Sequence, residues 1–179
     1  MPVADEEENE QSDKERDEKR REIERYLITA IGFCAKHDRA FRAHLLTSVC
    51  GIPETLAFSP VDVSVEPHYW GDLVISSRKN EFACVVECKV HAKLQNQQNP
   101  EIPGFEKTGY GASILEDFKN QRDIRYIVLG WEETLKLPQH SRIKYAQKQW
   151  SNLAEKFPQH RPLAADLYSC LSALGVPAF

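Results

Sequence analysis

Apolar positions in the first third of the chain recur with the spacing of helices and then of a strand. From Glu22 to Ala35 and again from Arg39 to Cys50, apolar side chains return every three or four residues, which predicts two helices. Gly51 follows the second stretch and suits a helix C-terminal cap. Val61–Val65 alternates strictly between apolar and polar residues, which predicts a half-buried strand.

Two further strands are predicted downstream, joined by a polar turn. Gly71–Ser77 and Glu81–Val90 are rich in β-branched and apolar residues, and Arg78-Lys79-Asn80 separates them. A two-residue turn at Lys79-Asn80 fixes the register of this hairpin, in which Val74 pairs with Val85.

The same register brings charged side chains together at one end of the hairpin. Asp72 pairs with Glu87, and directly opposed antiparallel residues lie roughly 4.5–5.5 Å apart at Cα and share a face. Lys89 points the same way, about 7 Å further along the strand. Because like charges directly opposite each other are unfavourable, something must compensate the two carboxylates. A divalent cation is the simplest candidate.

The second half of the chain predicts a helix, a buried strand and two more helices. Ala92–Gly111 is a long polar loop, and Ala112–Gln121 is expected to be a helix. Arg125–Gly130 is continuously apolar, which is typical of a central strand covered on both faces. Arg142–Phe157 and Leu163–Leu174 are interpreted as C-terminal helices. The predicted fold is therefore α/β, a central mixed sheet flanked by helices.

This order and the charged triplet resemble the PD-(D/E)XK nuclease superfamily, whose fold is the restriction-endonuclease-like core, α-β-β-β-α-β. The family has an acidic residue opening one strand and an acid-x-Lys triplet in the next, here Asp72 and Glu87-Cys88-Lys89. Gly71-Asp72 stands where the family often has Pro-Asp. The resemblance covers roughly Glu22 to Trp131.

The resemblance implies roles for these residues. Asp72, Glu87 and the backbone carbonyl of Cys88 would bind Mg²⁺, for which Mn²⁺ substitutes. Lys89 would orient or help deprotonate the attacking water and stabilise developing negative charge.

Further family positions fall on residues with an ordinary alternative. A helical glutamate often joins the metal site; Glu24 is our first choice and Glu22 the second, and either is equally well explained as a solvated helix-surface carboxylate. Gln95 matches a catalytic glutamine after the triplet, or is polar loop filler. Tyr110 packs beside the site or anchors the loop.

Charge is distributed unevenly along the chain. The first 25 residues carry eleven acids and six bases, a net of −5, so the chain total of −4 leaves about +1 for the rest. We expect residues 1–21 to be disordered or a frayed extension of the first helix, and residues 22–179 to form a single domain. A role of the tail in binding a partner or shielding a basic site is a further alternative.

The five cysteines have irregular spacing and match no zinc-ligand pattern. Cys84 and Cys88 alternate with the charged positions of their strand and should face the core. Reduced, buried thiols and the lack of a membrane span or signal peptide lead us to expect a cytoplasmic protein.

Basic residues on and after the hairpin are candidate nucleic-acid contacts: Arg78, Lys79, His91, Lys93 and Lys107. Because the body of the chain is only slightly positive, a homodimer or a partner subunit is expected to help select the target. The resemblance suggests a nuclease acting on DNA, in prokaryotic antiviral defence or in DNA repair and recombination. The alternatives are a catalytically silent nucleic-acid-binding or subunit-interaction module on the same fold, and an unrelated α/β domain with an accidental triplet.

Overall fold

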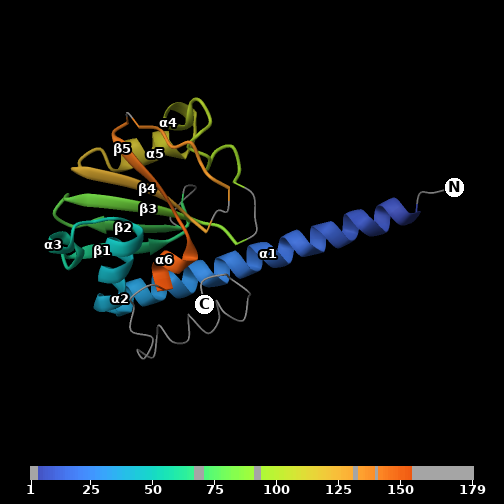
Figure 1. The fold of residues 1–179 in the computed structure, drawn as a ribbon, viewed down its shortest axis with the longest axis horizontal. Coiled ribbons are helices and arrows are strands. Elements are labelled where there is room, and N and C mark those ends of the chain that lie inside the picture. The colour runs from blue at the N-terminus through green and yellow to red at the C-terminus, as the bar shows by residue number, and fades with distance from the viewer. Residues whose placement is uncertain (1–3, 67–70, 91–93, 131–132, 140, 155–179) are drawn as a thin grey trace.

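The computed structural model describes residues 4–66, 71–90, 94–130, 133–139 and 141–154. They form a five-stranded sheet in the order β1-β2-β3-β4-β5 (Figure 1). β1 to β3 are antiparallel neighbours, whereas β3, β4 and β5 run parallel. The expected α/β class with a mixed sheet is confirmed. The strands are β1 (Val61–Val65), β2 (Leu73–Ser77), β3 (Phe82–Cys88), β4 (Asp123–Leu129) and β5 (Ile143–Lys148).

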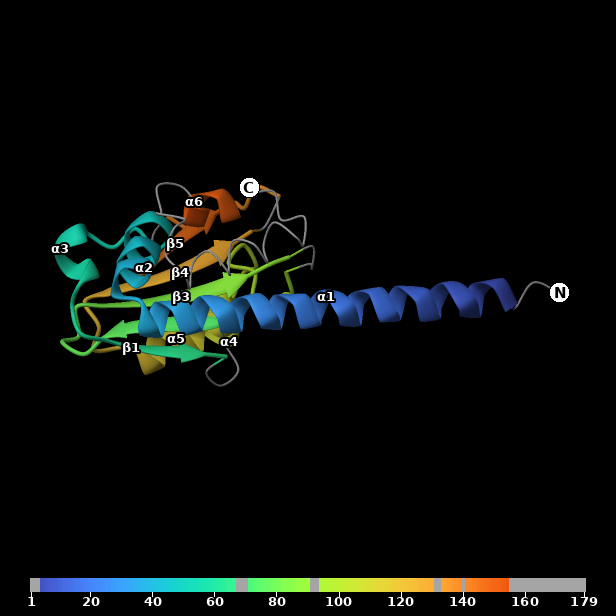
Figure 2. The same cartoon turned by 90° about the horizontal axis from the view of Figure 1, so that it is seen from below.

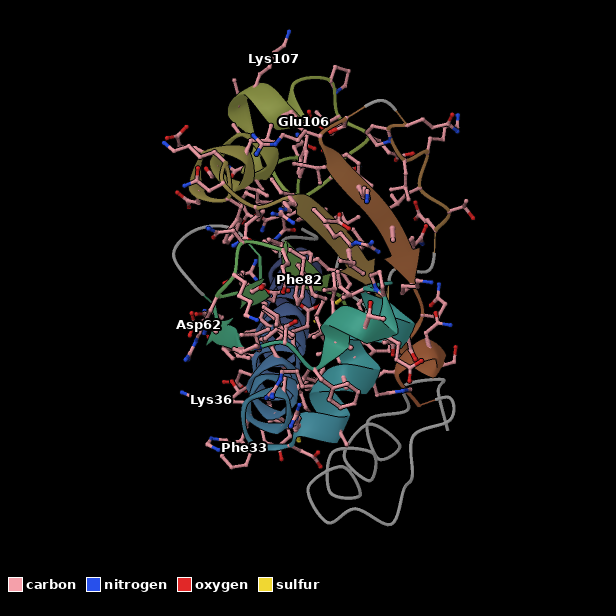
Figure 3. The ribbon with its side chains drawn as sticks, turned by 90° about the vertical axis from the view of Figure 1, so that its left-hand side faces the viewer. Phe33, Lys36, Asp62, Phe82, Glu106 and Lys107 are labelled. Atoms are coloured by element: carbon pink, nitrogen blue, oxygen red, sulfur yellow. The ribbon has the colours of Figure 1, made fainter. Side chains whose placement is uncertain are left out.

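Helices cover both faces of the sheet, because both faces are apolar. Leu27 and Ile31 of the first helix pack with Val86 in one core cluster. Phe105 and Ile114 pack with other sheet residues in a second cluster on the opposite face (Figures 1 and 3). The first face carries α1 (Ala4–His37), α2 (Arg39–His44), the π-helix η1 (Leu45–Val49) and α6 (Trp150–Ala154); the second carries α4 (Phe105–Thr108) and α5 (Tyr110–Asp117); α3 (Glu54–Ala57) precedes β1.

The hairpin of β2 and β3 has the predicted register. Val74 lies opposite Val85, in a ladder that runs from Leu73 to Ser76 on β2. The connecting turn is closed by a 3.2 Å hydrogen bond from the Asn80 N–H to the Ser77 carbonyl. Asn80 has a φ of +57°, a left-handed conformation that asparagine tolerates better than most residues.

The first two helices are separated in the gap between the two predicted helical stretches, Glu22–Ala35 and Arg39–Cys50. α1 ends at His37, and the Asp38 side chain accepts hydrogen bonds from the N–H groups of Ala40 and Phe41, which caps α2. After η1, Gly51 adopts a φ of +70°, as expected for a C-terminal cap.

α1 continues back to Ala4 through the charged segment for which we expected disorder or a frayed helical extension. Its C-terminal half packs against the sheet, and its N-terminal half projects well beyond the sheet (Figures 1 and 2). No helix among the described residues is long and apolar enough to cross a lipid bilayer.

The helix predicted over Arg142–Phe157 is wrong. Ile143–Lys148 is instead β5, paired in parallel with β4, and only Trp150–Ala154 is helical. Lys, Gln and Ala have good helix propensity, but pairing with a buried neighbouring strand outweighs that weak local preference. The helix predicted over Leu163–Leu174 lies outside the described residues. Part of the long predicted loop is also helical, as α4 and the first two residues of α5, Tyr110 and Gly111.

Candidate functional site

Asp72 stands directly before β2, and the backbone of β3 holds it in place. Its N–H donates to the Val86 carbonyl at 2.9 Å, although Val86 is the ladder partner of Leu73. The ladder ends at Leu73 and Val86, so the predicted direct pairing of Asp72 with Glu87 is not part of it. Its Oδ2 accepts a hydrogen bond from the Cys88 N–H at 2.7 Å. The carboxylate is thereby fixed across the end of β3, beside Glu87 and Lys89.

Glu87 and Lys89 form an ion pair on the same face of the sheet. Lys89 Nζ lies 2.8 Å from Glu87 Oε1. Glu87 is 1% exposed and Lys89 6% exposed, whereas Asp72 is only partly buried. Solvent therefore reaches the group formed by Asp72, Glu87 and Lys89, hereafter the cluster, at Asp72. Alternation along β3 turns Cys84 and Cys88 toward the opposite face, where both thiols are free and buried, as predicted.

Burial and the charges of neighbouring carboxylates make the two acids reluctant to ionise. Burial raises the pKa of Asp72 to about 6, although the Cys88 N–H and the Lys89 ammonium oppose this. Burial and the charge of Asp72 raise the pKa of Glu87 to about 8, again against Lys89. Burial would lower the pKa of Lys89, but Glu87 outweighs it and the pKa is raised. A cation between the carboxylates would stabilise their ionised forms.

Helix α1 contributes a third carboxylate to this end of the sheet. Glu24 Oε1 accepts a hydrogen bond from the Val90 N–H at 2.7 Å, just beyond β3. Its charge contributes to the raised pKa values of both Asp72 and Glu87. Of the two glutamates expected from this helix, Glu24 therefore lies at the cluster, whereas Glu22 is exposed.

The donor set suits a hard divalent cation. Among the described residues, the buried Glu87 Oε1 accepts no hydrogen bond of good geometry, although Lys89 Nζ lies 2.8 Å from it. The N–H and C=O of a strand residue point to the same side, so the Cys88 carbonyl faces the Asp72 side of β3. No three His, Cys, Asp or Glu side chains among the described residues are grouped to hold a metal by themselves. Two carboxylates and a backbone carbonyl nevertheless fit Mg²⁺, because this ion usually takes several of its ligands from water.

Gln95 does not meet the cluster. It is exposed and opens a turn in which its N–H donates to Gln98 Oε1 at 3.0 Å, and no contact joins its side chain to Asp72, Glu87 or Lys89. This position corresponds to the polar loop residue of our alternative interpretation.

The charges of Glu87 and Asp72 act on two tyrosine hydroxyls, those of Tyr110 and Tyr126. Burial and then the charge of Glu87 raise the pKa of Tyr110, whose hydroxyl also bonds the Gln98 side chain. Tyr126 is buried in the middle of β4 and donates from its hydroxyl to the Gln98 carbonyl at 2.9 Å. The sequence marked Tyr110 through its glycine neighbours but gave no reason to single out Gln98 or Tyr126.

Of the candidate nucleic-acid contacts that the structure describes, Arg78 and Lys79 lie at the opposite end of β3 from Glu87. Arg78 and Lys79 lie in the turn before β3, beyond Phe82, which is itself about 17 Å from Glu87 at the usual rise per strand residue. Arg78 pairs there with Asp62 at 2.8 Å. Lys107 points outward from α4 (Figure 3), and His91 and Lys93 lie outside the described residues.

Comparison with known proteins gives no family for this chain: no family model, no curated protein and no solved structure matches it.

Proposed function

We propose that this protein is a Mg²⁺-dependent nuclease of the PD-(D/E)XK type, with the restriction-endonuclease-like core, that hydrolyses phosphodiester bonds in DNA. The observation that carries the proposal is the convergence of Asp72, Glu87 and Lys89 on one face at the end of β3. The pKa values of Asp72 and Glu87 are both strongly raised, and such shifts in neighbouring ionisable groups are typical of functional sites.

In this proposal each charged group has one task. Asp72 and Glu87 hold the cation through carboxylate oxygens, with the Cys88 carbonyl as a further ligand. Bound Mg²⁺ lowers the pKa of its water and polarises a phosphoryl oxygen. Lys89 directs its ammonium toward the attacking water and the charge that develops on the phosphate. Glu24 adds negative charge at the same end and fixes α1 to Val90.

The biological setting follows from the resemblance alone. Small proteins with this motif serve prokaryotic defence against foreign DNA, or repair and recombination, and both settings are cytoplasmic. We propose the same range of roles here.

A catalytically silent module is the second candidate, and one observation favours it. Glu87 is almost fully buried and already paired with Lys89, as in a structural ion pair. A structural pair explains neither Asp72 nor Glu24 beside it, because additional carboxylates increase the repulsion.

A substrate screen separates the two candidates. Purified protein is incubated with plasmid, linear and single-stranded DNA and with RNA, in Mg²⁺, Mn²⁺ or EDTA. We expect metal-dependent cleavage of DNA that Lys89→Met and Asp72→Asn each reduce at least about 100-fold, whereas the exposed control Asp62→Asn cuts as wild type. Equal cleavage by wild type and Lys89→Met, with both proteins folded, would assign the activity elsewhere.

A further inference from the structure

The outer face of α1 carries large aromatic side chains. Tyr26 is 57% exposed and Phe33 52% exposed, and Phe33 points away from the sheet in Figure 3. The described residues include two further exposed large apolar side chains, Phe58 and Ile102, and neither belongs to α1. Tyr26 and Phe33 are seven residues apart, so they lie on one line along the helix. Two aromatic rings thus mark the solvent side of α1.

The exposed residues on this side have the spacing of a helix-packing seam. Tyr26, Thr29, Phe33 and Lys36 follow one another at intervals of three, four and three residues, and all four are exposed. Alternating steps of three and four residues keep side chains on one line, as in coiled coils. Continued toward the N-terminus, the same steps reach Glu22, Lys19 and Glu15. The seam is therefore aromatic in its middle and charged at both ends.

The order of charges along the seam favours a second copy of α1 in antiparallel orientation. When Tyr26 of one copy is placed opposite Tyr26 of the other, Phe33 lies opposite Lys19 and Lys36 lies beside Glu15. An ammonium group over an aromatic ring is favourable, and so are opposite charges. In a parallel pair every residue would lie opposite its own copy, so that Lys36 would meet Lys36 and Glu22 would meet Glu22.

The rest of α1 is compatible with this arrangement. Its buried residues face its own sheet, so packing through the outer face leaves the two sheets on opposite sides of the helix pair. The N-terminal half, which projects past its own sheet, gains a helix to pack against (Figure 2). Residues 4–13 contain six acids and no base, and they extend past the end of the partner's α1, where Lys36 and Arg39 are exposed.

We propose that this protein forms a two-fold homodimer in which the seam of Tyr26, Thr29, Phe33 and Lys36 on α1 packs antiparallel against the same seam of a second copy. A two-fold interface uses the same patch on both subunits, so each favourable contact occurs twice. This inference goes beyond the proposed function, because it concerns assembly and needs neither substrate nor metal. Since Glu24 ties α1 to the end of β3, the helix pair also joins the two clusters through a continuous element.

Removing the aromatic centre of the seam tests the dimer against a matched control. Tyr26→Glu/Phe33→Glu removes two exposed apolar side chains from the seam, and Phe58→Glu/Ile102→Glu removes two from elsewhere and adds the same charge. Sedimentation equilibrium of the full-length chain over about 1–100 μM measures the dissociation constant of the dimer. Circular dichroism verifies that each variant stays folded.

We expect wild type to reach twice the mass of one chain, the seam variant to raise the dissociation constant at least about tenfold, and the control to stay within about twofold of wild type. A wild type that is monomeric over the whole range overturns the proposal. Equal weakening by both double variants, or none by the seam variant, also overturns it.

A charge exchange tests the antiparallel orientation without changing the aromatic residues. Lys36→Glu places like charges beside Glu15 at both ends of the seam, so we expect association to weaken about three- to tenfold. Adding Glu15→Lys to the same chain restores opposite charges in exchanged order and should return the dissociation constant to within about twofold of wild type. In a parallel pair the second substitution would restore nothing, so a lack of rescue overturns the antiparallel dimer.

Discussion

Asp72 and Glu87 illustrate how one environment acts on two neighbouring acids. Burial raises the pKa of both acids, and the charge of Asp72 raises the pKa of Glu87 further. The hydrogen bond from the Cys88 N–H to Asp72 holds this carboxylate at the end of β3 that carries Glu87, so the fold brings both acids to one end of the sheet. Lys89 places one positive charge beside Glu87.

The raised pKa values predict how stability depends on pH. Since the folded pKa values of about 6 and about 8 exceed the unfolded values of about 4, the folded state binds more protons across this range. Without divalent cations, the contribution of these acids to stability is fully present below about pH 4 and is lost as pH rises toward 8. We expect Tm measured in EDTA to fall over this range through these two groups, and Mg²⁺ to raise Tm more at pH 8 than at pH 5.

Glu87→Gln supplies the control for this pH dependence. The variant removes the group with the higher pKa and should flatten the decline between about pH 6 and 8. A decline that is unchanged in Glu87→Gln would show that other groups cause it.

At the scale of elements, α1 is joined to the end of β3 by one carboxylate. Glu24→Ala leaves the buried Val90 N–H without its acceptor, and we expect a loss of about 1.5–3 kcal/mol in the free energy of unfolding. Glu24→Gln keeps an acceptor oxygen but removes the charge, so it should retain most of the stability while weakening the affinity for divalent cations. Chemical denaturation and calorimetric Mg²⁺ titration measure the two effects.

The exposed neighbour Glu22 is the matched control for Glu24. Glu22→Ala should change the free energy of unfolding by no more than about 0.5 kcal/mol, because it lies on the solvated surface of the same helix. A Glu24→Ala variant as stable as Glu22→Ala would contradict the assigned link between α1 and β3.

The end of β4 is closely packed against the backbone that carries Lys89. Gly130 has a φ of +86°, and a Cβ there would lie 2.1 Å from Trp150 Nε1 and 2.4 Å from the Lys89 carbonyl oxygen. That carbonyl accepts a hydrogen bond from the same Trp150 nitrogen at 3.1 Å. The lack of a side chain at Gly130 thus leaves room for Trp150 of α6 to bond the Lys89 carbonyl, which fixes the backbone at Lys89.

Substitution at Gly130 should therefore be far more costly than at another left-handed glycine. We expect Gly130→Ala to destabilise the protein by more than about 3 kcal/mol, since the clash adds to backbone strain. Gly104→Ala shares the left-handed φ, but its Cβ meets only Thr108 Oγ1 at 3.6 Å, so strain alone predicts about 1–2 kcal/mol. Similar losses in urea denaturation would contradict the packing described for Gly130.

For the molecule as a whole, local patterns predicted the hairpin and the central strands well but failed at the edge of the sheet. The register that aligns Val74 with Val85 follows from side-chain alternation and turn position, both readable in the sequence, whereas the predicted pair of Asp72 and Glu87 lies beyond the end of the ladder. β5 depends on pairing with β4, a contact between distant residues that outweighs the helical composition of Ile143–Lys148. Lys79 was expected near the cluster because sequence proximity does not show at which end of a strand a residue lies.

The sequence predicted the charged residues at the ends of β2 and β3, but not the contacts that residues of other elements make with them. Glu24 reaches Val90 because α1 runs past the end of β3, which helical period alone does not reveal. The approach of Tyr110 and Gln98 likewise depends on how the segment after β3 folds back over Tyr126. The sequence thus gives the charged residues, and the packing of distant elements gives their neighbours.

A crystal soaked in Mn²⁺ tests the central claim most directly. The account predicts an anomalous difference peak about 2.0–2.3 Å from carboxylate oxygens of both Asp72 and Glu87, lost in crystals of Asp72→Asn. A fully occupied Mn²⁺ bound elsewhere, with Asp72 and Glu87 free of metal, would contradict it.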